Sequence, residues 1–479
     1  MTARIFDVDQ TGNVLCSYDH GDRIDDNSDG SMKIEKTHVP LIKAIFYAFL
    51  PAGFPHTVTE DYLHYQIYDS LQAFSSSIAS LLANRAVLEG LGVGDASQSP
   101  TAALVLKIIQ DTISRLATIM FAHRMGTAIE PECKSYRFLA DIFNDAAQIL
   151  DLLVPVLPLL PKVSVLVTSG CLRSLCGVAA GASKASLSAH FAKTGNLAEL
   201  NAKEASQETV VSLVGMLTGT AVVHMVEDKT AVWCWMVVLI CMHLMMNYRA
   251  VRNVRMLTLN RQRATIVFRE FLETGKVLTP AQCSARESIL LNSRGNMGSK
   301  SGDYKGFCQF GSYGDVMSWR PWGYHRYDFE TDDYFMGIYH WRSTFYIRIA
   351  MKETSREGRA NGPLLAWFDA VAHAYHFDSA LKDGLGSHTE HAGPAGYISP
   401  ETKETVLKAL TAAGWDIYDG QLEIRSPVRV RMADAGKKVP FALPPSEKAA
   451  IISQHQHHVP STQSSHGQYH TVPQEMKHD

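Results

Sequence analysis

Charged residues are scarce in this 479-residue chain, at 19% of the total against roughly 25% in an average soluble domain. The deficit is uneven: residues 60–255 are apolar with scattered charges, whereas residues 256–479 are polar and contain many Arg, His and Asp residues. The net charge is −3, and no basic stripe interleaved with aromatic residues is present. These absences argue against a nucleic-acid partner and indicate a protein whose first half is unusually apolar.

Short catalytic signatures are also absent. The sequence contains no G-x-S-x-G, P-loop, dinucleotide fingerprint or H-E-x-x-H motif. Its eight cysteines form no C-x-x-C pair and have no zinc-ligand spacing, which favours free, packed thiols. His388 and His391 stand three apart in a Gly/Pro-rich loop, and this spacing alone does not predict a metal site. We therefore expect no enzyme activity, no cofactor and no metal ion.

The N-terminus has neither the apolar core of a secretory signal nor the Arg-rich composition of a transit peptide. We therefore expect internal segments to drive any membrane insertion, and we expect no plastid targeting. Residues 4–8 and 13–17 flank a Thr-Gly-Asn turn and predict a short hairpin. Residues 39–55 hold an apolar run that is too short to span a bilayer, and we interpret it as an interfacial segment.

Six long apolar segments follow. Each is near the ~20 residues that a helix needs to cross ~30 Å of hydrocarbon, and the sixth, TAVWCWMVVLICMHLMMNY, is the clearest. The segments cover residues 67–93, 100–123, 137–158, 162–190, 205–226 and 230–250. The alternative is a buried helical bundle in a soluble protein.

Basic residues between these segments are distributed unevenly. If all six segments cross the membrane, one side carries ten basic residues and the other carries two. The positive-inside rule then places the first side, and with it both termini, in the cytoplasm of a multi-pass membrane protein. The ten are Arg124, Lys134, Arg137, Lys193, Lys203, Arg249, Arg252, Arg255, Arg261 and Arg263, and the two are Lys162 and Lys229.

From about residue 260 the pattern changes to α+β. Residues 334–353 are strand-like, residues 362–377 form an amphipathic pattern, Ser399 is a candidate helix cap, and Asp419-Gly420 predicts a hairpin turn. The fold class is therefore predicted to be mainly α, a six-helix membrane bundle followed by a smaller α+β domain. The predicted parts are a polar N-terminal segment (1–38), the membrane bundle (39–258), the α+β domain (259–440) and a disordered tail (441–479).

A short sequence echo connects the two halves of the bundle. Residues 94–105, GDASQSPTAALV, return as residues 203–214, KEASQETVVSLV. Each copy places acid-Ala-Ser-Gln just before an apolar helix. In this register three helices repeat, and an odd number of spans per repeat inverts the second copy, as in many transporters. The echo therefore indicates a 3+3 inverted repeat, the arrangement of half a transporter.

Charged residues inside the apolar segments are costly, at about 2.5–3.5 kcal/mol each near the bilayer centre, and should face protein or water. Three pairs stand at helical spacing four on the first three segments, and an arginine lies on the fourth. These seven residues are Arg85 and Glu89, Asp111 and Arg115, Asp141 and Asp145, and Arg173. We predict that the two aspartates of the third segment pair with the arginines across the bundle. Such a network would form a substrate or proton pathway, or would fix the helix register.

Small residues also recur at helical spacing four. Gly177 and Gly181 share one face of the fourth segment, and Gly215 and Gly219 share one face of the fifth. Small residues at this spacing let helix backbones approach closely in membranes. We therefore predict helix packing at both pairs, with a substrate groove as the alternative.

The apolar half resembles the core of the root UVB sensitive (RUS) family. The resemblance is carried by residues 50–103, by FLADIFNDAAQILDLLVPVLP and by GNLAELNAKEASQET, and it extends over about residues 40–275. It implies a multi-pass membrane protein whose plant relatives act in seedling development, UV-B responses and vitamin B6 homeostasis. It also implies association with another RUS-type chain, and it supplies no catalytic residues.

Two functions are compatible with this sequence. In the first, the bundle carries a small anionic metabolite such as a vitamin B6 vitamer, which Arg85, Arg115 and Arg173 bind while the aspartates take a proton. In the second, the bundle anchors a scaffold whose α+β domain recruits a protein partner. The expected partners are membrane lipid, a second RUS-type chain in a homo- or hetero-oligomer, and a small-molecule substrate, without nucleic acid.

Overall fold

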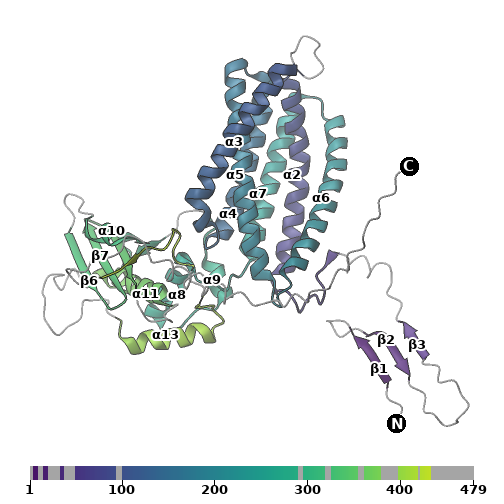
Figure 1. Ribbon diagram of the computed structural model, residues 1–479. Coiled ribbons are helices and arrows are strands. Elements are labelled where there is room, and N and C mark those ends of the chain that lie inside the picture. The colour runs from purple at the N-terminus through teal and green to yellow at the C-terminus, as the bar shows by residue number, and fades with distance from the viewer. Residues whose placement is uncertain are drawn as a thin grey trace, which may run out of the picture. The chain divides into compact units, whose positions relative to one another are not determined.

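The computed structural model describes residues 4–8, 14–19, 33–36, 49–92, 100–289, 295–318, 325–353, 361–378, 398–418 and 421–432. Within them the chain is mainly helical, with a sheet in its C-terminal region (Figure 1). Several predicted features lie outside these residues: the start of the sequence echo, most of the interfacial segment, His388 and His391, the turn at Asp419-Gly420 and the tail.

The predicted N-terminal hairpin is confirmed and has a third strand. β1 (Arg4–Val8) pairs antiparallel with β2 (Val14–Asp19), and Arg4 lies opposite Asp19. β3 (Lys33–Lys36) pairs antiparallel with the other edge of β2, so the strand order is β1-β2-β3. The third strand was not predicted, because its four residues are too few to establish a pattern.

Six long helices lie side by side in the next part of the described chain (Figure 1). Each overlaps one of the six apolar segments. They are α2 (Tyr62–Gly90), α3 (Pro100–Ile129), α4 (Cys133–Leu153), α5 (Leu159–Phe191), α6 (Leu197–Met225) and α7 (Lys229–Asn253). A 3₁₀ turn, η1 (Val154–Val156), follows α4. α2 packs against α6 and α7, whereas α5 packs against α3 and α4.

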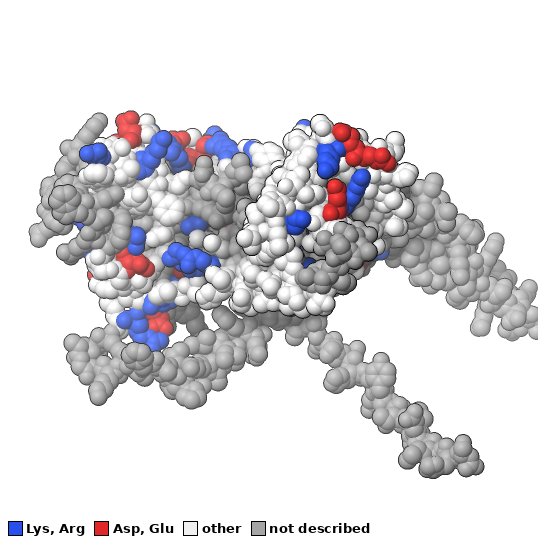
Figure 2. All heavy atoms as spheres, turned by 90° about the horizontal axis from the view of Figure 1, so that it is seen from above, with Lys and Arg blue, Asp and Glu red and all other residues white. Residues whose placement is uncertain are grey.

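Three of these helices, α5, α6 and α7, are long and apolar enough to cross a membrane. α4 differs because charged residues, including Lys134, Arg137 and Asp141, recur along it. Apolar side chains are nevertheless exposed on α3 as well, where Ile108 and Ile119 are 55% and 65% exposed. In Figure 2 uncharged residues cover most of the visible surface of the bundle, whereas charged residues are spread over the C-terminal region. The crossing of all six helices stays a prediction.

The loop-charge count needs a correction. Four of the ten basic residues on the predicted cytoplasmic side are buried, with exposed fractions between 2% and 8%, and each has a carboxylate partner. They are Lys134, Arg137, Arg261 and Arg263. Buried, paired charges do not act as loop charges, so six basic residues remain against two. The predicted orientation is unchanged, but its support is weaker.

The C-terminal region contains a mixed sheet of strand order β4-β5-β8-β7-β6, with β9 also paired to β8. β5 and β9 run parallel to β8, and the other neighbouring strands are antiparallel. The strands are β4 (Asn296–Gly298), β5 (Lys305–Phe310), β6 (His325–Glu330), β7 (Tyr334–Trp341), β8 (Thr344–Lys352) and β9 (Arg429–Val430). The helices are α8 (Arg261–Thr274), α9 (Pro280–Arg286), α10 (Tyr313–Met317), α11 (Gly362–Tyr375) and α13 (Pro400–Ala412).

Local signals located most of these elements. The strand-like stretch forms two strands, because Arg342 turns the chain with a φ of 53° between β7 and β8. Ser399 caps α13 as predicted, and its hydroxyl accepts a hydrogen bond from the Thr402 amide at 3.2 Å. The core forms where α11 packs on α8 and the sheet, with Trp367 completely buried and its indole donating to the Thr265 hydroxyl at 3.0 Å.

Candidate functional site

A group of buried polar side chains lies inside the bundle where α2, α4 and α7 meet. Each member is at most 8% exposed, although the helices around it are largely apolar. We call this group the bundle network. Its members are Asp69 and Gln72 of α2, Arg137, Asp141 and Asp145 of α4, and His243 and Asn247 of α7.

Arg137 joins two helices through its guanidinium. Nη2 lies 2.8 Å from Oδ1 of Asp69, and Nη1 lies 2.9 Å from Oδ1 of Asp141. Asp141 stands one helical turn after Arg137 on α4, which places both side chains on one face. A buried guanidinium is stable only with such charged partners, so these two ion pairs account for a cation at this position.

His243 lies between two carboxylates. Its Nδ1 is 2.8 Å from Oδ1 of Asp145, and its Nε2 is 3.3 Å from Oδ2 of Asp141. The Asn247 amide donates to the same Asp141 carboxylate and to the backbone carbonyl of Arg137. An imidazole that contacts one carboxylate through each nitrogen can receive a proton on one side and release it on the other.

Three polar contacts between α2 and α4 share a constant sequence separation of 68 residues. Arg137 contacts Asp69, and further along the helices the Asn144 amide donates to Ser76 at 3.2 Å. The Gln148 amide then donates to Ser80 at 3.0 Å. A constant separation requires the two helices to run parallel in fixed register, so polar residues determine how α2 meets α4.

The network holds more carboxylates than cationic groups. Three carboxylates face one guanidinium and one imidazole. In addition, three buried side-chain oxygens of the network have no hydrogen-bond partner among the described residues: Oε1 of Gln72, Oδ2 of Asp145 and Oδ1 of Asn247. Oε1 of Gln148, farther along α4, also lacks one. An excess of negative charge and free acceptors suits a proton or another donor, not an anion.

Most of the residues singled out from the sequence lie elsewhere, and the predicted pairing of Asp141 and Asp145 with Arg85, Arg115 or Arg173 is wrong. Arg85 donates to the carbonyls of Val223 and Val226, both at 2.9 Å, at the C-terminal end of α6. Helix carbonyls there lack partners along the chain, which explains why they attract an arginine.

The other predicted pairs are also rearranged. Glu89 lies 3.9 Å from Lys229 instead of pairing with Arg85, and Asp111 lies 3.0 Å from Lys107 instead of pairing with Arg115. Arg115 is exposed on α3. Arg173 binds Asp151, whose other oxygen accepts a hydrogen bond from Ser169 at 2.5 Å.

The sequence interpretation missed Asp69, Arg137, His243 and Asn247. A signal for three of them was available: Arg137, Asp141 and Asp145 recur every four residues on α4, as do His243 and Asn247 on α7. Two polar stripes at helical spacing on neighbouring segments predict a shared buried face. Asp69 accepts a hydrogen bond from Gln72 on the same helix at 2.7 Å, but its ion-pair partner Arg137 is 68 residues away and could not be predicted from local spacing.

The two glycine pairs differ in how closely other helices pack against them. A Cβ at Gly215 would lie 2.6 Å from Cβ of Ser77, and one at Gly219 would lie 2.6 Å from Cδ1 of Leu81, so both glycines pack against α2. At Gly177 and Gly181 a Cβ would meet nothing within 4 Å among the described residues. The expected helix packing is therefore absent at Gly177 and Gly181 in the single chain.

We predict opposite effects for alanine at these two kinds of position. Gly177→Ala should stabilise the chain by up to about 1 kcal/mol, because alanine is the better helix former. Gly215→Ala should destabilise it by about 1–3 kcal/mol, because the added methyl group overlaps Ser77. Thermal unfolding of both variants in detergent tests this, and a stabilised Gly215→Ala variant would contradict the close contact.

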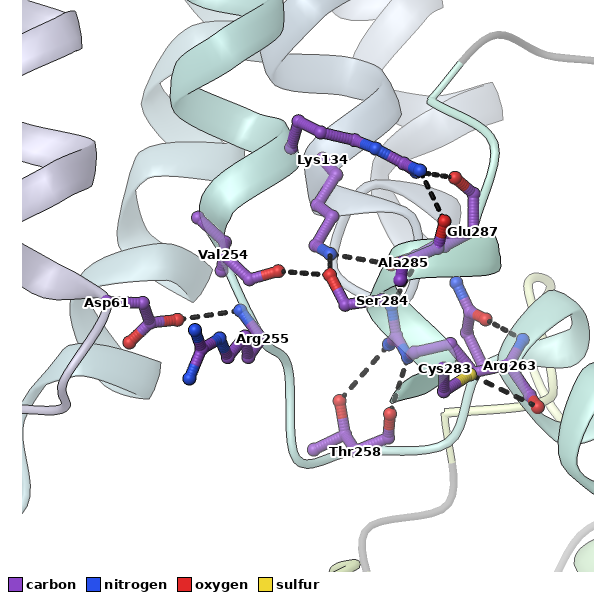
Figure 3. A network of polar contacts seen from close by, with 12 residues as sticks. Asp61, Lys134, Val254, Arg255, Thr258, Arg263, Cys283, Ser284, Ala285 and Glu287 are labelled. Atoms are coloured by element: carbon purple, nitrogen blue, oxygen red, sulfur yellow. Dashed lines mark hydrogen bonds and ion pairs between the residues drawn. The ribbon is translucent and has the colours of Figure 1, made fainter. Parts of the chain in front are cut away.

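A second buried cluster joins the bundle to the C-terminal region (Figure 3). Glu287 lies at its centre, with Oε2 at 2.6 Å from Nζ of Lys134 and Oε1 at 2.9 Å from Nη1 of Arg263. The Ser284 hydroxyl donates to the Val254 carbonyl at 2.9 Å in the same cluster. All three charged side chains are at most 4% exposed. We call these residues the junction cluster.

Electrostatics keep Glu287 ionised. Burial raises the pKa of its carboxyl, but the charges and hydrogen bonds of Lys134 and Arg263 lower it by more, so the pKa lies below its ordinary value. At nearby Cys283, burial and the charge of Glu287 outweigh the charges of Arg263 and Lys134 and raise the pKa of the thiol to about 12. Cys283 is therefore a neutral packed thiol and not a nucleophile.

Asp61, just before α2, forms polar contacts at the end of the bundle where the junction cluster lies. Its Oδ2 lies 3.0 Å from Nε2 of His190. The same oxygen accepts a hydrogen bond from the Arg255 amide at 2.6 Å (Figure 3). Burial raises the pKa of the Asp61 carboxyl, but the hydrogen bond and charge of His190 lower it more, to about 2. Within the described residues no group of His, Cys, Asp and Glu is arranged to hold a metal ion.

Comparison with known proteins gives a consistent result. A family model described as the vitamin B6 photo-protection and homoeostasis domain matches residues 35–275. The chain is 35% identical over 298 residues to RUS family member 1 of Dictyostelium discoideum, covering 60% of this chain and 56% of that protein. It is 36% identical over 250 residues to Protein root UVB sensitive 3 of Arabidopsis thaliana, covering 52% and 56%.

A third relative is Protein root UVB sensitive 2, chloroplastic, of Arabidopsis thaliana, at 29% identity over 278 residues and covering 56% of this chain and 62% of that protein. The chain thus spans little more than half the length of the curated relatives it matches. No solved structure matches the chain. The matched region contains all of the bundle network and the Lys134 and Arg263 side of the junction cluster.

Proposed function

Because this chain belongs to the root UVB sensitive family, whose domain is described by vitamin B6 photo-protection and homoeostasis, we propose that its bundle is a proton-coupled membrane carrier for a small molecule of the vitamin B6 class. The observation that carries the proposal is the bundle network, in which His243 bridges Asp141 and Asp145. Buried ionisable groups inside membrane bundles commonly serve substrate or proton pathways.

We propose that α2, α3 and α4 cross the membrane together with the three more apolar helices, with both termini in the cytoplasm. Lipid-facing positions support this, because α2 and α3 also expose large apolar side chains such as Ile67 and Leu116, at 51% and 56%. The charges of α4 face inward and are paired, which is the arrangement that hydrocarbon requires. Membrane lipid is then the partner of the outer surface.

We also propose an inverted repeat of α2–α4 and α5–α7. In such a repeat α2 corresponds to α5, α3 to α6 and α4 to α7. The packing of α2 against α6 and α7 then corresponds to the packing of α5 against α3 and α4, and both sets of contacts are present. The second copy of the echo, residues 203–214, lies within α6 and not before it, so the echo supports the repeat less than the packing does. The contact of α2 with α4 has no counterpart of similar extent.

In this proposal protons move through the contact between α4 and α7, which belong to different repeats. Alternating access in repeat transporters moves one repeat against the other. Such movement would change the distances from His243 to Asp141 and Asp145, and a proton could then leave on the opposite side. No covalent chemistry is involved, and we propose that the chain is not an enzyme.

We propose that the working unit is an oligomer, formed by two copies of this chain or by this chain and another RUS-type protein. Six helices correspond to half of a twelve-span carrier. Gly177 and Gly181 leave an exposed small-residue stripe on α5, where a second helix could approach closely. Chemical crosslinking of the chain in its membrane measures this association.

Uptake into proteoliposomes tests the carrier. We expect the purified full chain to accumulate radiolabelled pyridoxine when a pH gradient is applied, and to lose accumulation when a protonophore collapses that gradient. Liposomes without protein give the background rate. The absence of uptake for pyridoxine, pyridoxal and pyridoxamine, in both orientations of the gradient, would contradict the proposal.

The alternative is a membrane scaffold, and the junction cluster favours it because a buried, ion-paired contact holds the α+β domain firmly on the bundle. A truncation after residue 258 would be a poor test, since it leaves Lys134 buried without Glu287. Substitution of an exposed residue on α13, such as Lys408→Glu, is a better test of scaffolding, because Lys408 is 75% exposed and pairs only with Glu404 in the described chain. Loss of function in cells with normal uptake would support scaffolding.

A further inference from the structure

A cleft of about 780 Å³ lies between the C-terminal end of α3 and the α+β domain. Its volume falls in the range of roughly 300–1,000 Å³ that small-molecule sites occupy in proteins. Basic residues from three separate segments line it. His123 and Arg124 come from α3, Arg261 is the first residue of α8, and Arg425 lies in the segment before β9.

The walls of this cleft are held together by specific contacts. The Thr127 hydroxyl of α3 donates to the Ile424 carbonyl at 2.8 Å, and the Ile424 side chain packs on the apolar cluster around Ile129. On the same segment, Gln421 accepts a hydrogen bond from the Thr258 hydroxyl at 2.8 Å. Arg425 is therefore carried by a segment that is fixed to the end of the bundle.

The acidic residues of the cleft are already engaged. Glu423 binds Arg429 through both oxygens, each at 2.7 Å from a guanidinium nitrogen. Asp315 accepts two hydrogen bonds from Ser312, both at 2.8 Å, which lower the pKa of its carboxyl, and the charges of Arg348, at 3.6 Å, and of Arg425 lower it as well. Arg429 and Arg348 do not line the cleft. Glu423 is thus neutralised from outside the cleft, whereas Asp315 is stabilised by Ser312, by Arg348 and by Arg425 of the lining.

The basic residues of the cleft have fewer carboxylate partners. In the part of the chain that the structure describes, no carboxylate lies within 4.0 Å of Arg124 or Arg425, and both side chains are exposed to the cleft. Arg261 is 2% exposed at the base, 3.7 Å from Glu132. The cleft therefore has an excess of guanidinium groups, which bind planar or tetrahedral oxyanions through paired N–H donors.

Aromatic residues form another part of the lining. Phe307 and Phe310 come from β5, and the Phe310 ring stacks on the ring of Trp367 at 5.7 Å between centroids. Because Trp367 is fully buried, Phe310 is held by the core of the α+β domain. Flat aromatic surfaces favour a ligand that has an aromatic ring of its own.

We propose that this cleft binds a small aromatic molecule that carries a phosphate group, with Arg124 and Arg425 on the phosphate and the β5 aromatic residues against the ring. The choice of a vitamin B6 phosphate ester as the ligand rests on the proposed function, but binding to the cleft requires no transport. The bundle network lacks free cations for an anion, so the anion site and the proton site are separate.

Equilibrium binding to the full chain in detergent tests the proposal. Pyridoxine 5′-phosphate is the probe, because it has no aldehyde that could react with lysines, and pyridoxine and inorganic phosphate are the comparison ligands. We expect each comparison ligand to bind at least about ten-fold more weakly than pyridoxine 5′-phosphate. We expect Arg425→Ala to weaken the binding of pyridoxine 5′-phosphate by about ten-fold. Arg124→Ala should act in the same direction.

Lys408→Ala is the matched control, since it removes an exposed cation of the same domain outside the cleft. Its affinity should equal that of the unaltered chain. Equal binding of pyridoxine and its phosphate, or unchanged binding in both arginine variants, overturns the phosphate site. Binding of inorganic phosphate as tight as that of the ester overturns the role of the aromatic lining. Since uptake is not measured, failure here is distinct from failure of the carrier.

Discussion

Replacing Glu287 with alanine is expected to lower the free energy of unfolding by about 3–5 kcal/mol, because it leaves two buried cations without their carboxylate. Lys134 and Arg263 are 3% and 2% exposed, so water cannot replace the lost partner without opening the junction. Denaturant unfolding of the full chain in detergent, followed by tryptophan fluorescence, measures the loss. Trp367 and Trp415 lie in the affected core and report on it.

A matched control is available on α8. Glu270 also pairs with an arginine, Arg286, but the two side chains are 20% and 52% exposed. Exposed ion pairs contribute only about 0–1 kcal/mol, so Glu270→Ala should change the stability little. Equal losses in the two variants would contradict the central role of Glu287 in the junction cluster.

The junction cluster also predicts how stability depends on pH. Burial raises the pKa of Glu287, but its two cationic partners lower it further, to below the ordinary value of 4.5. Its contribution is therefore fully present above pH 4.5 and is lost as the pH falls through the lower pKa of the folded state. Glu287→Gln should flatten the pH profile of unfolding in this acidic range, and an unchanged profile would contradict the assignment.

Asp145→Asn is expected to reduce pH-driven uptake by about ten-fold or more while leaving substrate exchange across the membrane intact. The carboxylate lies 2.8 Å from Nδ1 of His243, and an amide at this position still occupies the space but does not take up a proton. Driven uptake needs protonation and release, whereas exchange of external for internal substrate does not. His243→Gln should behave in the same way, since it breaks the contact with both carboxylates.

Asp111→Asn is the matched control for this experiment. Asp111 is exposed on α3 and pairs with Lys107, outside the bundle network, so both driven uptake and exchange should persist. A structural role for Asp145 would instead impair the two activities together. Normal driven uptake in Asp145→Asn would remove the network from the coupling mechanism.

The sequence predicted elements whose cause is local. The hairpin of β1 and β2 follows from strand alternation around a turn, and α13 follows from the Ser399 cap with Pro400 at its first position. The six apolar segments coincide with α2–α7 because a long run of apolar residues has few other ways to satisfy its backbone. The change from the helical bundle to the α+β region near residue 260 could also be predicted, because the amino-acid composition changes there from apolar to polar.

The partners of the charged residues could not be predicted from the sequence. Lys134, Arg137 and Arg263 have the sequence context of loop charges, yet each is buried against a carboxylate on another element. Arg85 and Glu89 have the spacing of an ion pair, yet Arg85 binds carbonyls of α6. Helical spacing states only which residues share a face, and the neighbouring helix decides which partner that face receives.

The sequence by itself determined the family, the long apolar helices and the change to an α+β region, because each depends on residues close together in the chain. Only the tertiary structure decided that His243 lies between Asp141 and Asp145, that Glu287 joins the two regions, and that Arg124 and Arg425 line one cleft. Those positions depend on helix rotation and register, which are set by packing between segments that are not neighbours in the sequence.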